Sequence, residues 1–100
     1  MSKQKKKRIK INLKAKNFKD RYPMVECRWI DICSDASWMS LEHLASIKPP
    51  TCVTKGHLLS QAKGVTRIFG DYSLDDDGNL EEVGNATAIP NSVIKEIIRI

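Results

Sequence analysis

Basic side chains gather at the start of this chain. The first nineteen residues, MSKQKKKRIKINLKAKNFK, hold nine Lys or Arg and no Asp or Glu. Such a run neutralises phosphates and holds nucleic acid without reading its bases. The predicted nucleic-acid-binding residues are Lys3, Lys5, Lys6, Lys7, Arg8, Lys10, Lys14, Lys16 and Lys19. The alternative is a solvated leader on a domain that works elsewhere.

The other reactive residues form no catalytic or metal-binding motif. The three Cys (27, 33 and 52) and two His (43 and 57) lack the spacing of zinc ligands. The run DDDGN resembles part of a calcium loop, but Gly84 falls where that loop needs a bidentate acid. Neither a phosphate-binding glycine loop nor a nucleophile elbow is present. We therefore expect a non-enzymatic protein with no catalytic residue, metal or cofactor.

The aromatic residues divide into two groups. Phe18 and Tyr22 lie beside the basic leader, where an aromatic ring can stack on an unpaired base. Trp29 and Trp38 stand among apolar residues and are predicted to be in the core.

Charge and length indicate one domain with a distinct leader. The leader carries +9, whereas residues 20–100 hold eight basic and twelve acidic residues and carry −4. The predicted division is a basic extension at 1–22 and a small β-barrel domain at 23–100. We expect no secretory signal and no membrane span, because no sufficiently long apolar run exists. An odd number of Cys argues against a disulfide framework and favours a reducing compartment.

Alternating apolar residues predict short strands. Val25, Cys27 and Trp29 share one parity, and the change of parity at Ile30 predicts either a bulge or burial of both faces near the end of that strand. Further strands are predicted at 51–59, 65–72 and 87–89, and a one-turn helix at 91–93 leads into a final strand. The leader segment RIKINL also alternates and could add to a sheet edge of its own domain or of a neighbour.

A helical insert is predicted between the first two strands of the body. Ser34 or Asp35 is the expected cap, and Trp38, Leu41 and Leu44 have helical spacing. The Pro pair at 49–50 prevents the helix from continuing.

These elements predict a mainly β fold, a small five-stranded barrel with a short helical insert and a basic N-terminal extension. Gly56 and Gly70 within strands are typical of sharp bends. A domain of this size buries only about 60% of the surface that its unfolded chain exposes, so we expect a homo-oligomer. Ile97, Ile98 and Ile100 could serve its interface or fill the core.

The order of several short motifs resembles a family of small tailed-bacteriophage proteins. The matching pieces are Trp29-x-Asp31, then Trp38, then C-x-T-x-G-x-L from Cys52, then the Ile89-Pro90 pair before an Ile-rich end. The resemblance covers about residues 24–100 and implies an Sm-like or SH3-like barrel, a fold that often forms rings. An Asp that follows the second strand in many Sm proteins is replaced here by the region of Ser60 and Gln61.

Two functions are compatible with these observations. The first is an Sm-like oligomer of phage type that binds nucleic acid through its basic arm. The second is a phage structural or host-protein-binding module in which the arm contacts a protein partner. A sponge for small anionic signalling molecules is a third alternative. The expected location is the host cytoplasm or the virion.

Overall fold

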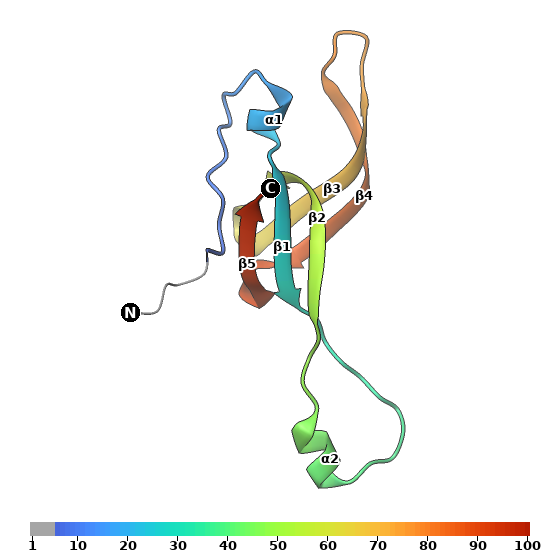
Figure 1. Cartoon of the computed structure of the whole chain (residues 1–100). Coiled ribbons are helices and arrows are strands. Elements are labelled where there is room, and N and C mark those ends of the chain that lie inside the picture. The colour runs from blue at the N-terminus through green and yellow to red at the C-terminus, as the bar shows by residue number, and fades with distance from the viewer. Residues whose placement is uncertain (1–5) are drawn as a thin grey trace, which may run out of the picture.

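A five-stranded antiparallel sheet forms the body of the protein. The computed structural model describes residues 6–100, and Figure 1 shows their arrangement. The strands are β1 (Met24–Ile30), β2 (Thr51–Ser60), β3 (Val65–Leu74), β4 (Leu80–Pro90) and β5 (Ile94–Arg99). The short helices are α1 (Phe18–Arg21), α2 (Leu41–Ser46) and the 3-10 turns η1 (Ala62–Gly64) and η2 (Asn91–Val93). The predicted mainly β class with five strands is confirmed.

The sheet is open and is not closed into the predicted barrel. The strand order is β4-β3-β2-β1-β5, which leaves β4 and β5 at opposite edges. The sheet bends so that β3 and β4 cross behind the other three strands (Figure 1). Part of the β5 edge is taken by the leader, because Ile97 N–H donates to the Lys6 carbonyl at 2.8 Å. This donor is therefore not available to pair with β4.

The local predictions within the body are largely confirmed. A register shift lies between Arg28 and Trp29, where the change of parity predicts a bulge. The one-turn helix at η2 leads into β5 as expected. The strand predicted at 87–89 is longer, because β3 and β4 pair as one hairpin down to Leu74 and Leu80. Asp75 closes its tip by accepting from the backbone N–H groups of Asp77 and Asn79.

The hydrophobic core lies inside the bend of the sheet and receives residues from all five strands. Its buried members are Val25, Cys27, Leu58, Ile68, Ile89, Ile94 and Ile97. Trp29 packs against this cluster and donates its indole N–H to Thr54 Oγ1 at 3.0 Å, as expected for a partly buried Trp. At the Ile-rich end, Ile97 fills the core, whereas Ile98 and Ile100 are exposed.

The insert between β1 and β2 does not join the core. Residues 31–50 form an arm, and Figure 1 shows this arm extending away from the sheet with α2 at its far end. Trp38 is 101% exposed, so its prediction as a core residue is wrong. Ser40, and not Ser34 or Asp35, caps α2 by accepting from His43 N–H. The predicted helix is confirmed for Leu41 and Leu44, whereas Trp38 precedes α2, and within residues 6–100 no other element packs against these side chains.

The cysteines differ in environment, and this gives a first testable prediction. Cys27 is buried, whereas Cys33 is exposed. Burial raises the pKa of the Cys27 thiol to about 11. Because the thiolate is the nucleophile, a thiol reagent should modify Cys33 much faster than Cys27 in the folded protein. Mass spectrometry of partially labelled protein would locate the label.

Unfolding in urea is the control for this labelling, because it should make the two thiols equally reactive. Equal labelling rates in the native protein would contradict the assigned environments.

The raised pKa of Cys27 also makes the stability of the fold depend on pH. The neutral Cys27 thiol favours the fold fully below its ordinary pKa of 9.0, and this contribution is lost as the pH rises through about 11.

Candidate nucleic-acid interface

The described part of the leader is fastened to the body along its backbone. Beyond the contact between Lys6 and Ile97, Gln61 makes two hydrogen bonds to this segment. Its Nε2 donates to the Lys7 carbonyl at 3.0 Å, and its Oε1 accepts from Ile9 N–H at 2.8 Å. Gln61 is itself buried and also donates to Thr66 Oγ1 at 2.9 Å. A buried amide with all these partners holds the leader in one register.

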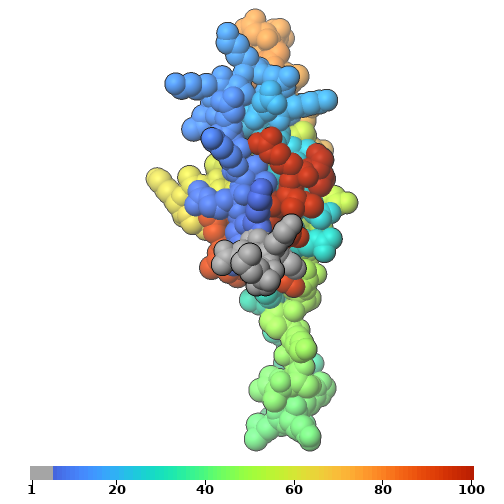
Figure 2. Space-filling view, turned by 60° about the vertical axis from the view of Figure 1, so that its left-hand side comes forward, coloured from blue at the N-terminus to red at the C-terminus, as the bar shows by residue number. Residues whose placement is uncertain are grey.

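The alternation of the RIKINL segment corresponds to burial at Ile9 and Ile11 but not at Leu13, which is exposed. Ile9 and Ile11 are partly buried and pack against the core cluster, whereas Arg8 and Lys10 are exposed. The segment is extended but is not a β-strand. It lies at an edge of its own sheet, beside β5, and Figure 2 shows the blue leader next to the red C-terminal strand. The prediction of an edge position is therefore correct for this chain, and that of a regular strand is not.

A turn and a short helix carry the chain from the leader to β1. Ala15 N–H donates to the Asn12 carbonyl, and Asn12 Oδ1 accepts from Lys14 N–H, each at 3.1 Å. Asn17 then caps α1 by accepting from Lys19 N–H at 2.8 Å. Asn at both positions fits its ability to hydrogen-bond the backbone two residues on.

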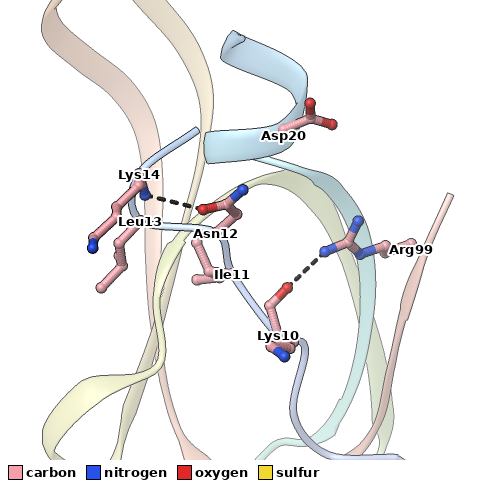
Figure 3. Close-up of a pocket in the computed structure, with 7 residues that line it drawn as sticks. All are labelled: Lys10, Ile11, Asn12, Leu13, Lys14, Asp20 and Arg99. Carbon is pink, nitrogen blue, oxygen red and sulfur yellow. Dashed lines mark hydrogen bonds between the residues drawn. The ribbon is translucent and has the colours of Figure 1, made fainter. Parts of the chain in front are cut away.

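An open hollow of about 670 Å³ lies where the leader passes the end of β5 (Figure 3). Its lining residues are Lys10, Ile11, Asn12, Leu13, Lys14, Asp20 and Arg99. Arg99 donates to the Lys10 carbonyl at 2.6 Å, which brings a cation from the far end of the sequence to the leader. Sequence reasoning missed Arg99 and Gln61, because both meet the leader only through the tertiary fold.

The predicted basic residues lie on the surface of this segment. Those within the described part are all exposed, namely Lys6, Lys7, Arg8, Lys10, Lys14, Lys16 and Lys19. Lys3 and Lys5 lie outside the described residues. The ion pairs found within residues 6–100 join Glu26 to Arg28 and Lys55, and neither involves the leader. The charges of the described leader are therefore directed to solvent, where a polyanion can reach them.

Aromatic rings gather beside the end of this basic segment. Phe18 stacks on Tyr72 with ring centroids 4.6 Å apart, and Tyr72 remains 44% exposed. Tyr22 lies 5.1 Å from Phe18 and carries the Arg21 guanidinium over its ring at 4.6 Å. His57 completes the group and contacts the Tyr22 carbonyl through Nδ1 at 3.1 Å. The sequence placed Phe18 and Tyr22 near the leader, but it gave no sign that Tyr72 would join them.

Other kinds of site were sought in the same part of the chain. Among residues 6–100, no three His, Cys, Asp or Glu side chains come together in a way that could hold a metal ion. No helix in this range has the length and apolar character needed to cross a membrane. Comparisons with protein-family models, with curated proteins and with solved structures found no match.

Proposed function

We propose that this protein is a non-enzymatic module that binds single-stranded nucleic acid through its basic leader. The main support is that the leader's backbone is hydrogen-bonded to the body while its basic side chains are exposed. Backbone contacts to Gln61 and Ile97 order the leader, while its Lys and Arg side chains face solvent without ionic partners in the described range.

Ordering the backbone in advance favours binding. A disordered tail loses conformational entropy when it binds, whereas a segment already fixed on the body loses less. Each phosphate that contacts a Lys or Arg also releases counterions, so several contacts together produce measurable affinity. The exposed Tyr72 ring, supported from below by Phe18, gives the same face a surface on which an unpaired base can stack.

The relation to phage proteins and to Sm-like or SH3-like domains remains part of this proposal. This relation is supported by the five antiparallel strands, by the buried Gly56 in β2 and by the one-turn helix before the last strand. A homo-oligomer in the host cytoplasm or virion belongs to the same proposal. A protein partner for the leader is the second candidate, favoured by Leu13, an apolar residue that is 71% exposed beside the hollow.

Salt dependence of nucleic-acid binding tests the proposal. The full-length protein should bind a single-stranded oligonucleotide with little sequence preference. The double variant Lys10→Gln/Lys14→Gln should make the slope of log affinity against log salt less negative by about 1.4, at about 0.7 per phosphate contact. Fluorescence anisotropy across a salt series would measure both slopes.

The matched control is Lys48→Gln/Lys95→Gln, which removes the same charge from exposed positions outside the leader. It should leave the slope close to that of the unchanged protein, apart from the small general effect of net charge. Equal slopes for the two double variants, or no binding by the full-length protein at low salt, would rule out the leader as a nucleic-acid interface.

A further inference from the structure

The arm between β1 and β2 exposes a set of large apolar side chains. Trp38 is fully exposed, Leu41 is 86% exposed and Ile32 is 85% exposed, with Leu44 also largely in solvent. Isolated exposed apolar residues are normal on protein surfaces, but several together on one projection indicate an interaction site. Ser40 caps α2, and Asp35 Oδ1 accepts from both the backbone N–H and the hydroxyl of Ser37. These local hydrogen bonds order the arm although its apolar side chains are exposed.

A second hollow, of about 600 Å³, lies between the leader and the end of β2 and could receive such side chains. Ile9, Ile11, Leu13 and Leu59 supply its apolar lining, and Arg8 and Lys10 supply positive charge. Leu13 is the most exposed apolar member and also lines the hollow of Figure 3. The site therefore combines apolar surface with basic side chains.

The arm has the opposite charge. It carries Asp31, Asp35 and Glu42 against one basic residue, Lys48. An apolar segment with a net negative charge is complementary to an apolar hollow with positive side chains, and such complementarity selects partners and orients them. The arm of the same chain points away from the body, so its own hollow is not the one that it fills (Figure 1).

We propose that the arm of one copy docks, Trp38 foremost, into the hollow between the leader and β2 of a second copy. The two surfaces differ, so the contact is head-to-tail and builds a ring or a filament. A buried aromatic residue covers about 150–250 Å², and a standard interface removes about 800 Å² per partner. Trp38 with Ile32, Leu41 and Leu44 thus supplies a large share of one side. This inference does not depend on nucleic-acid binding.

Complementation between two variants tests this pairing. Trp38→Ser removes the arm's main contact and leaves the hollow intact, whereas Leu13→Asp spoils the hollow and leaves the arm intact. Both side chains are exposed in the single chain, so both variants should keep the native fold and melting temperature. We expect the unchanged protein to assemble and each variant to associate at least about tenfold more weakly, as for a central aromatic contact. An equimolar mixture should form dimers, because one functional arm meets one functional hollow.

Sedimentation velocity over a dilution series measures these species. Leu74→Asp is the matched control, since Leu74 is exposed but belongs to neither surface, and it should assemble like the unchanged protein. A blue shift of Trp38 emission on assembly, taken as the difference from Trp38→Ser, would support the docking. A monomeric unchanged protein, variants that assemble normally, or a mixture that stays monomeric would each overturn it. A shift of Trp38 emission with neutral phosphatidylcholine vesicles and no self-assembly would also overturn it and assign the arm to a lipid surface.

Discussion

Replacing Gly56 by alanine is expected to lower the free energy of unfolding by about 1–3 kcal/mol, the usual cost of forcing extra atoms into a packed interior. A Cβ at this buried position would lie 2.6 Å from Ile68 Cγ2 and 2.8 Å from the Phe69 carbonyl oxygen. The Ile68 side chain can adjust, but the Phe69 oxygen belongs to the backbone of the neighbouring strand. Relief therefore requires β2 and β3 to move apart.

Gly70→Ala is the matched control for this substitution. Gly70 lies in β3, and its added Cβ would meet nothing closer than Asn85 Cβ at 3.4 Å, an ordinary contact. Its effect should stay within about 0.5 kcal/mol, as for most surface changes. Urea unfolding of both variants would compare them directly. Equal free energies of unfolding for Gly56→Ala and Gly70→Ala would contradict the close approach of β2 and β3 at Gly56.

Replacing Gln61 by leucine is expected to release the leader from the body. Leucine keeps most of the buried volume but removes the acceptor for Ile9 N–H and the donor to the Lys7 carbonyl. Leaving such groups without partners costs about 1–3 kcal/mol each. The leader should therefore detach from the body, so that these backbone groups form hydrogen bonds with water instead. Hydrogen exchange should then accelerate at Ile9. It should also accelerate at Ile97, whose N–H depends on the Lys6 carbonyl.

Asn12→Ala is the comparison for Gln61→Leu. It removes an exposed hydrogen bond to Lys14 N–H within the leader itself and should leave the Ile9 and Ile97 amides protected. Mass spectrometry of exchanged peptides would separate the two variants. Undiminished protection at both amides in Gln61→Leu would mean that packing of Ile9 and Ile11 on the core holds the leader by itself.

The two proposals meet at the same surface. Lys10 lies on the basic leader proposed to contact phosphates, and it also lines the hollow proposed to receive the arm of a second copy. Both ligands would be negatively charged, so an oligonucleotide and the arm should compete. Assembly would then leave fewer basic side chains free for nucleic acid, and the Trp38→Ser variant would offer all of them.

Much of the local structure could be predicted from the sequence, because it depends on neighbours along the chain. Local patterns located β1, β2, β3 and β5 but only the end of β4, and the parity change at Ile30 indicated the bulge at Trp29. In the leader, the same alternation distinguished Ile9 and Ile11 from the exposed basic residues. Such patterns record which face of a segment is buried, and this information is local.

Only the tertiary structure decided what each face is buried against. Helical spacing at Trp38 and Leu41 predicted burial, but no other element in the described part of the chain packs against the arm, so both remain in solvent. The contacts of Gln61 and Arg99 with the leader join residues 52 to 89 positions apart. The openness of the sheet is equally non-local, since it depends on whether β4 or the leader reaches the edge of β5. By itself the sequence determined the strands and the charge of the leader. The fold decided where that charge is displayed, because pairing between distant segments depends on packing that no local pattern encodes.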